Sequence, residues 1–258
     1  MLSLLPMRVH YVMSDILFFI IFHILHYRRR TVWVNLVTSF PERPEDELLE
    51  IERRFYHWFC DYLAETVKLM TISRKELKKR MTFKNTELID KYVNEGRSCA
   101  VYLGHYCNWE LVTSLPLWVS DKAQCGQIYH PLENKMFDKL YLKLRQRFGS
   151  VCIPMQETLR KIVGYKRENR PVVIGYISDQ VPFWWNIHHW CDFLHHDTPV
   201  LSGTERIARQ ANHVVFYLDL TRTSRGHYEA EFKLITDEPQ KMPEFEITDI
   251  YFRMLEQT

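Results

Sequence analysis

The chain has 258 residues, a hydrophobic fraction of 46% and a formal net charge of +2 at neutral pH. This length fits one large α/β domain or two small ones, with enough apolar residues for a packed core. Only 8 glycines and 11 prolines argue against a disordered chain, and the near-neutral charge gives no reason to expect a nucleic-acid partner. The six cysteines form no CxxC pair, which favours buried free thiols in a reducing compartment over a disulfide framework.

An apolar decamer, Ile16 to Leu25, dominates the N-terminal region. It follows Asp15 and precedes an arginine triplet at 28–30, with no small-residue cleavage site after it, so we expect no cleaved signal peptide. The decamer is short for a membrane span, and Asp15 and His23 would be costly in a bilayer core. We therefore predict an interfacial or re-entrant helix whose arginines meet anionic head groups. The alternative is a core helix packed on the catalytic domain.

Helical and strand patterns alternate along the rest of the chain. Three- and four-residue apolar spacing predicts helices at 44–72, 75–80, 85–94, 109–118, 135–148, 158–167 and 248–255. Short β-branched and aromatic runs predict strands at 99–103, 124–129, 151–154, 172–178, 214–221 and 227–235. This alternation predicts an α/β domain with a central, mostly parallel sheet flanked by helices. The expected organisation is a membrane-associated helical arm at 1–30 and a catalytic domain at 31–258.

The segment from Gly104 to Glu110 is the most informative motif. His105 follows the predicted strand 99–103, and Asn108 is a suitable N-cap for the next helix. Residues five apart on one helix point roughly 140° away from each other. His105 therefore has to stay in the loop to meet Glu110 in the first helical turn. A histidine held by a carboxylate is the arrangement of a general base. The alternative is an ordinary turn in which His105 satisfies a backbone group.

Asp179 and Gln180 follow the predicted strand 172–178. Open α/β sheets build their sites at the carboxyl ends of strands. The strand ending at Leu103 delivers His105 to the same edge, so we predict that His105 and Asp179 open onto one pocket. The alternative is that Asp179 only caps a turn.

Four ordered blocks carry a family resemblance. They are 27–30 with 35–36 and 39–42, then 104–110, then 129–134 with 137–138 and 144–145, and finally 178–180 with Phe193 and 198–199. The chain resembles the lipid A secondary acyltransferases of the lauroyl or myristoyl type, a branch of the lysophospholipid acyltransferase superfamily. The residues within these blocks most resemble those of the enzymes from Bacteroidetes. His105 and Glu110 form the HxxxxE version of the superfamily motif, which is weak alone and specific only within the ordered set.

The resemblance implies a glycerolipid acyltransferase-like fold and transfer of a fatty acyl group from acyl carrier protein. The acceptor would be a hydroxyacyl chain of a lipid A precursor bearing Kdo sugars, at the cytoplasmic face of the inner membrane. Another lysolipid or glycolipid is the alternative acceptor. His105, aligned by Glu110, would act as the base without a covalent intermediate, so Cys107 is not expected to be a nucleophile. No cofactor or metal is expected.

The resemblance also implies a set of substrate-binding residues, namely Asn108, His130, Asn134, Arg145, Asp179 and Gln180. Asp179 would bond the acceptor sugar or a neighbouring arginine, with His130 and Arg145 near the phosphates. Two departures from the family pattern stand out. Many relatives have arginine at the position of His130, so that a protonated His130 or Arg145 has to fill its role. Relatives also continue into a tryptophan-rich basic tail, so we expect a C-terminally incomplete chain.

A rival hypothesis comes from the segment His188–His196. Together with Asp197 it holds four histidines, a cysteine and two aspartates, which are common metal ligands. Its spacing fits no standard site, and adjacent histidines in a strand point to opposite faces. A metal-dependent hydrolase is therefore the less favoured alternative. A catalytically silent membrane-binding protein is a third.

Overall fold

A computed structural model describes residues 2–258. The chain divides by its internal contacts into two compact units. The first unit extends to Ser73 and includes Asp192–Asp197, and the second contains Arg74–Cys191 and Thr198–Thr258. Residues 2–30 of the predicted arm thus belong to a larger helical unit.

Helices make up most of the first unit. They are α1 (Met7–Phe18), which continues as a π-helical segment (Phe19–Ile24), α2 (Arg29–Ser39) and α3 (Glu45–Leu69), after a short 3₁₀ turn at Leu2–Leu4. The stretch Met7–Ile24 is long and apolar enough to cross a membrane by length and composition, with a mean hydropathy of 1.4. The predicted decamer is the carboxyl-terminal part of this stretch, and the helix begins well before it.

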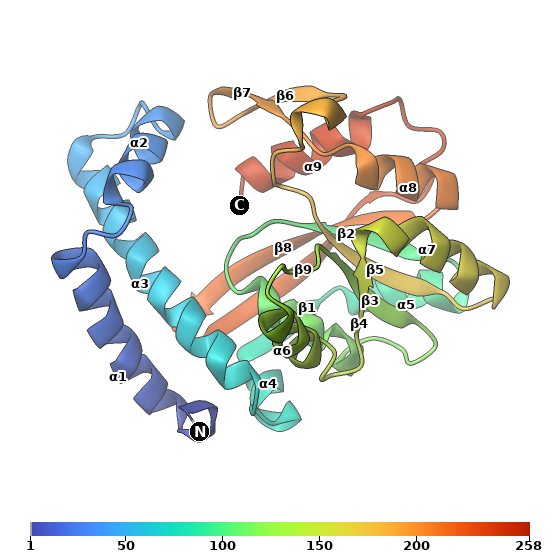
Figure 1. The fold of residues 1–258 in the computed structure, drawn as a ribbon. Coiled ribbons are helices and arrows are strands. Elements are labelled where there is room, and N and C mark those ends of the chain that lie inside the picture. Colours follow the sequence, from blue (N-terminus) through green and yellow to red (C-terminus); the bar gives the residue numbers. More distant parts are fainter. Residues whose placement is uncertain (1) are drawn as a thin grey trace. The chain divides into compact units, whose positions relative to one another are not determined.

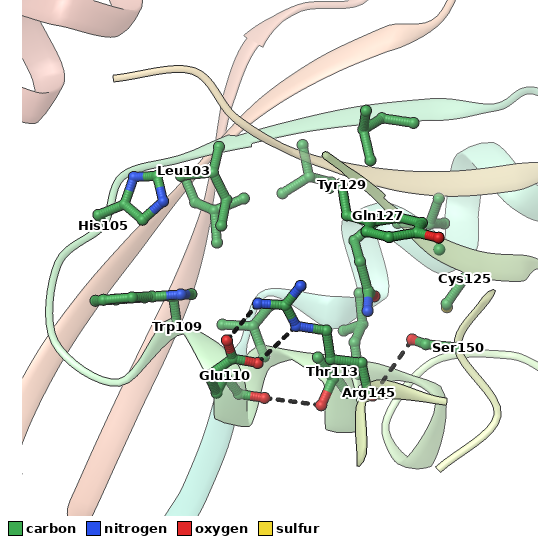
Figure 2. Close-up of a pocket in the computed structure, with 18 of the residues that line it drawn as sticks. Leu103, His105, Trp109, Glu110, Thr113, Cys125, Gln127, Tyr129, Arg145 and Ser150 are labelled. Atoms are coloured by element: carbon green, nitrogen blue, oxygen red, sulfur yellow. Dashed lines mark hydrogen bonds and ion pairs between the residues drawn. The ribbon is translucent and has the colours of Figure 1, made fainter. Parts of the chain in front are cut away.

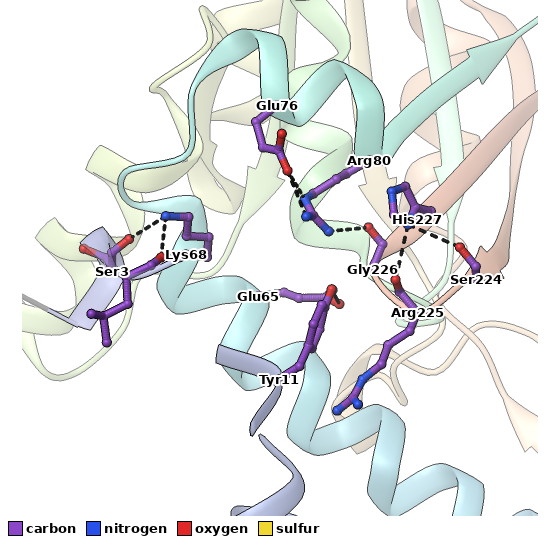
Figure 3. A network of polar contacts seen from close by, with 11 residues as sticks. Ser3, Tyr11, Glu65, Lys68, Glu76, Arg80, Ser224, Arg225, Gly226 and His227 are labelled. Atoms are coloured by element: carbon purple, nitrogen blue, oxygen red, sulfur yellow. Dashed lines mark hydrogen bonds and ion pairs between the residues drawn. The ribbon is translucent and has the colours of Figure 1, made fainter. Parts of the chain in front are cut away.

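Polar side chains join α1 to α3. The Tyr11 hydroxyl donates to Glu65 at 3.0 Å, and the Ser14 hydroxyl donates to Asp61 at 2.8 Å. Both carboxylates are buried. Lys68 donates to the backbone carbonyl of Ser3 at 3.1 Å (Figure 3). Buried charges of this kind need partners, so one face of α1 is committed to α3, while its other face stays apolar and exposed.

The second unit is built on a seven-stranded sheet. Its spatial order is β1-β9-β8-β2-β5-β3-β4. All neighbouring strands are parallel except β8 and β9, which are antiparallel. The strands are β1 (Met81–Lys84), β2 (Cys99–Leu103), β3 (Gln124–Tyr129), β4 (Val151–Pro154), β5 (Val172–Ile177), β8 (Val214–Ser224) and β9 (His227–Thr236). The predicted α/β class and mostly parallel central sheet are confirmed.

Helices cover both faces of this sheet. They are α4 (Arg74–Arg80), α5 (Thr86–Asn94), α6 (Lys135–Arg145), α7 (Thr158–Arg167), α8 (Gly203–Ala211) and α9 (Glu246–Glu256), with short 3₁₀ turns at Met155–Glu157 and Trp184–Asn186. In Figure 1, α8 and α9 lie on one side of the sheet and α5 and α6 on the other. Strands β6 (Trp190–Phe193) and β7 (His196–Pro199) form a separate two-stranded sheet. Arg80 of α4 donates to Gly226 in the β8–β9 turn at 3.2 Å (Figure 3).

The pleat of β2 and β5 separates two environments. Tyr102 and Tyr176 are register partners, and Tyr102 packs against Tyr251 of α9 with ring centroids 5.0 Å apart. Because successive side chains of a strand point to opposite faces, Val101 and Leu103 face away from α9. All five residues of β2 are buried. This opposite face carries the pocket described below.

The helix predicted at 109–118 differs in type. The structure has a 3₁₀ helix, η3 (Trp109–Leu117), and Asn108 makes no capping hydrogen bond with its side chain. Thr113 and Ser114 donate to the carbonyls of Glu110 and Leu111, each at 2.7 Å. Such side-chain bonds compete with the α-helical ladder. Pro116 removes a further backbone donor, so the tighter helix replaces the predicted one.

A buried histidine makes the stability of the second unit depend on pH. Burial lowers the pKa of His213 to about 4. The unfolded chain takes up a proton near the ordinary value of about 6.5, while the folded chain keeps His213 neutral until pH falls much lower. The free energy of unfolding should therefore drop by about 2 kcal/mol between ~pH 7 and ~pH 5, measured by urea unfolding. His213→Gln should abolish this part of the slope. His196→Gln, at an exposed position, is the matched control, and an equal effect of both changes would contradict the assignment.

Candidate active site

The catalytic loop begins at a crowded glycine. A Cβ on Gly104 would lie 2.7 Å from Leu255 Cδ1 and 3.3 Å from Asp179 Oδ2. Contacts below about 3 Å force a neighbour to move, so a larger residue would require the Leu255 side chain to shift. Gly104 therefore lets the chain leave β2 close to both β5 and α9. The next residue, His105, stands at the carboxyl edge of the sheet.

His105 is held by Asp179. The ring Nδ1 of His105 lies 2.7 Å from Asp179 Oδ1, and the backbone N–H of His105 donates to Asp179 Oδ2 at 2.7 Å. Both carboxylate oxygens thus fix one residue. Asp179 follows β5, whose last residue Ile177 is the register partner of Leu103. Trp109 presents its ring edge-on to the imidazole at 5.1 Å.

Glu110 does not meet His105, so the predicted pairing of these two residues is wrong. Its carboxylate accepts from Arg145 Nε at 2.9 Å and from a second guanidinium nitrogen at 2.5 Å (Figure 2). Glu110 is 2% exposed, so its charge requires such a bidentate partner. Arg145, the last residue of α6, supplies it. Asp179, and not Glu110 as the motif predicted, is the carboxylate that bonds the His105 ring.

A pocket of about 320 Å³ opens beside His105. Asp179 is not among the residues that line it, so the structure does not show the predicted opening of both side chains onto one pocket. Three neighbouring strands, β2, β5 and β3, form its floor, and η3 and α6 contribute its walls (Figure 2). Aliphatic side chains and glycines prevail on the floor, with Val101, Leu103, Val173, Gly175 and Ile177 among them. Polar side chains also line the pocket, among them His105, His130, Arg145 and Gln180. The pocket therefore combines an aliphatic floor with polar groups that include His105.

The remaining predicted site residues divide into two groups. His130 and Gln180 line the pocket together with Arg145. Asn134 instead caps α6, its side-chain oxygen accepting from the backbone of Met136 at 3.0 Å and of Phe137 at 3.2 Å. Asn108 is fully buried and does not line the pocket. For Asn134 the structure thus shows a capping role, and substrate contact by either asparagine stays a prediction.

Cys107 is a buried thiol whose pKa is raised. Burial raises its pKa to about 11. The thiolate is the nucleophilic form of cysteine, and at neutral pH almost none of it is present here. This supports the expectation that no acyl-cysteine intermediate is formed.

The histidine-rich segment shows no convergent ligand set. His189 is paired with Asp249 of α9 at 2.6 Å and stacks on Phe245 with centroids 4.4 Å apart. Across residues 2–258, no group of three or more histidine, cysteine, aspartate or glutamate side chains is arranged to hold a metal ion. The described residues of this segment therefore do not form the metal site that the hydrolase alternative requires.

Tyr251 of α9 binds the end of β2. Its hydroxyl donates to the Leu103 carbonyl at 3.0 Å. Burial raises the pKa of Tyr251 well above its ordinary value, so the hydroxyl remains a donor. Leu103, two residues before His105, is therefore tied to α9. No local pattern in the sequence predicts this contact, because Tyr251 lies more than seventy positions beyond Asp179.

A histidine–aspartate pair beside a mainly apolar pocket is typical of an enzyme that acts on a polar group beside an aliphatic chain. The comparisons with known proteins agree with this class. A family described as bacterial lipid A biosynthesis acyltransferase matches residues 1–258, and the chain belongs to this family. A lipid A biosynthesis acyltransferase of Haemophilus influenzae is 22% identical over 245 residues, covering 93% of this chain and 76% of the relative. The protein is thus an acyltransferase of lipid A biosynthesis in a Gram-negative bacterium, which implies a lipid A-type acceptor.

The hydrogen bond from Tyr251 to Leu103 predicts that removing the Tyr251 hydroxyl lowers both stability and activity. Tyr251→Phe leaves the buried Leu103 carbonyl without this donor, at a cost of about 1–3 kcal/mol in the free energy of unfolding. Because the His105–Asp179 spacing loosens, kcat should fall and the acid limb of the pH–rate profile should shift. Tyr102→Phe is the matched control, since the Tyr102 hydroxyl has no hydrogen-bond partner within residues 2–258. Identical behaviour of the two variants would show that Tyr251 positions nothing.

Proposed function

We propose that the enzyme transfers a fatty acyl group from acyl carrier protein to a hydroxyacyl chain of a Kdo-bearing lipid A precursor. The observation that carries this proposal is the His105–Asp179 pair beside a mainly apolar pocket, in a chain of the lipid A acyltransferase family. The polar side chains of the pocket suit the reacting groups, and the apolar floor suits an aliphatic chain. Acyl carrier protein as donor and Kdo sugars on the acceptor follow from the family resemblance.

His105 serves as the general base in this mechanism. Asp179 bonds Nδ1, so Nε2 is the nitrogen that accepts the proton. The acceptor hydroxyl oxygen attacks the thioester carbonyl as its proton passes to Nε2. When the tetrahedral intermediate collapses, the carbon–sulfur bond breaks and the leaving thiolate takes the proton from His105. Asp179 stabilises the imidazolium that exists between these two transfers.

Glu110 contributes through Arg145 rather than through His105. The bidentate pair fixes the guanidinium in the pocket wall. A cation held there stabilises negative charge, either on the oxyanion of the intermediate or on a phosphate of the acceptor. His130 and Gln180 are further substrate contacts in the pocket. In this scheme the HxxxxE motif supplies two separate functions, the base and the anchor of a cation.

The first unit attaches the enzyme to the membrane. The exposed apolar face of α1 and the arginines at 28–30 suit an interfacial position at the cytoplasmic face of the inner membrane. Arg29 is engaged with Glu52 of α3, so Arg28 and Arg30 are the arginines that would meet lipid head groups.

Substitutions at the pair test the mechanism. His105→Ala should lower turnover by about 10²–10⁴-fold, the usual contribution of a general base. Asp179→Asn should cause a loss of similar size, because the asparagine amide no longer holds the proton on Nδ1. Turnover is measured as acyl transfer from acyl carrier protein to the precursor, with products identified by mass spectrometry.

Glu110→Gln provides the contrast. It should weaken substrate binding and fold stability through Arg145 while leaving the pH dependence set by His105 in place. A His105→Ala enzyme with full turnover would refute the mechanism. An altered His105 pH profile in Glu110→Gln would restore the direct pairing that the structure does not show.

The pocket floor predicts which residue limits acyl chain length. Gly175 of β5 lines the pocket, and a Cβ there would make only ordinary contacts, the nearest at 3.7 Å. Gly175→Ala should therefore be tolerated, whereas Gly175→Leu would project into the cavity. The larger variant should shift the transferred chains toward shorter lengths by a few carbons, as read from the mass of the product. Unchanged chain lengths at normal activity would mean that the acyl group lies elsewhere.

A further inference from the structure

An exposed aromatic segment follows a residue that lines the pocket. Gln180 lines the pocket, and within five residues come Phe183, Trp184 and Trp185, which are 60%, 79% and 63% exposed. Large side chains of this kind rarely stay in water as a group in a soluble protein. Three large exposed aromatic side chains next to the pocket indicate a surface that binds a partner.

The aromatic segment is ordered by its own contacts. Phe183 and Trp185 stack with centroids 4.8 Å apart and planes 5° apart, and Trp184 meets Trp185 edge-on at 5.5 Å. The backbone N–H of Asn186 donates to the Phe183 carbonyl at 2.8 Å. The rings therefore form a preorganised cluster that still exposes most of its surface.

A second exposed apolar surface also follows a residue that lines this pocket. Leu132 lines the pocket, and α6 begins three residues later. This helix exposes Met136, Phe137 and Leu140 to solvent. Three lysines, Lys135, Lys139 and Lys143, are exposed on the same helix. An exposed apolar stripe bordered by cations is typical of a helix that lies in a membrane interface.

The two surfaces together define a mouth collar, made of Met136, Phe137, Leu140, Phe183, Trp184 and Trp185. We propose that the mouth collar inserts into the interface of an anionic bilayer and thereby presents the pocket to the lipid acceptor. This contact belongs to the second unit and is separate from α1. It rests on the proposed function only for the identity of the acceptor.

The chemistry of the mouth collar favours a bilayer over a protein partner. Tryptophan prefers the head-group level of membranes, where its ring is buried and its N–H stays hydrated. The lysines of α6 would meet anionic head groups at that depth. A protein surface covering the same area would have to pair or desolvate each of these ammonium groups. A lipid-facing pocket mouth also spares the acceptor from leaving the bilayer to reach His105.

Tryptophan fluorescence tests this contact in the full chain. Vesicles contain phosphatidylglycerol and phosphatidylcholine with brominated acyl chains, which quench only indoles at the membrane. The parent should show strong quenching, and the Trp184→Phe/Trp185→Phe double variant should lose at least half of the quenched emission. Trp118→Phe removes an indole of the same unit that is not part of the mouth collar, and it should lose none. Equal quenching in the parent and the double variant would overturn the proposal.

Acyl transfer supplies a second readout. The Trp184→Ser/Trp185→Ser variant should lose about tenfold more activity on acceptor embedded in vesicles than on acceptor dispersed in detergent. Leu234→Ser, at an exposed apolar position on β9, should lose neither. An equal loss in both assays would show that the tryptophans serve the fold or the chemistry rather than the membrane.

The lysines of α6 separate a lipid surface from an acidic protein donor. Lys139→Gln/Lys143→Gln should reduce quenching by phosphatidylglycerol vesicles. If this variant only raised KM for acyl carrier protein and left quenching unchanged, α6 would be the donor surface and its part in the mouth collar would be refuted. Because quenching needs no catalysis, membrane contact without acyl transfer would refute the proposed function while leaving the mouth collar in place.

Discussion

The parallel pairing of β2 with β5 is the constraint on which the site depends. Its register sets Leu103 beside Ile177, so the chain leaves both strands at the same edge. His105 and Asp179 are 74 positions apart in sequence, yet their hydrogen bonds need no long side chains to form. A shift of one residue in this register would turn one of the two side chains to the opposite face. The same strands also form the pocket floor, so catalytic geometry and substrate space are set by one set of backbone hydrogen bonds.

A buried ion pair stands next to this constraint and has a different role. Glu110 and Arg145 are charged groups in the wall of a mainly apolar pocket. Removing one partner of such a pair leaves an uncompensated charge, which is far more costly than the pair itself is stabilising. His105 and Glu110 therefore have separate partners, although they lie in one loop: His105 bonds Asp179 and Glu110 bonds Arg145. The histidine faces the carboxyl edge of the sheet, and the glutamate faces α6.

The sequence predicted the fold class, most strands and the edge of the sheet that carries the site, because hydrophobic period and strand ends are local signals. It missed α2, β1, α8 and the β6–β7 pair, all of which are short segments. It also misassigned the partner of His105, since proximity in sequence favoured Glu110 over the distant Asp179. The contact of Tyr251 with Leu103 could not be predicted either, because the two residues are far apart in sequence. This contact depends on how α9 packs on the sheet, which no linear pattern specifies.

The crowding at Gly104 ties the catalytic loop to Leu255 of α9. During synthesis β2, His105 and β5 leave the ribosome well before residues 251–255 do. A nascent chain can thus form its β2–β5 pairing early and still lack the support behind the loop. The loop that carries His105 therefore gains this packing partner only after α9 has been synthesised.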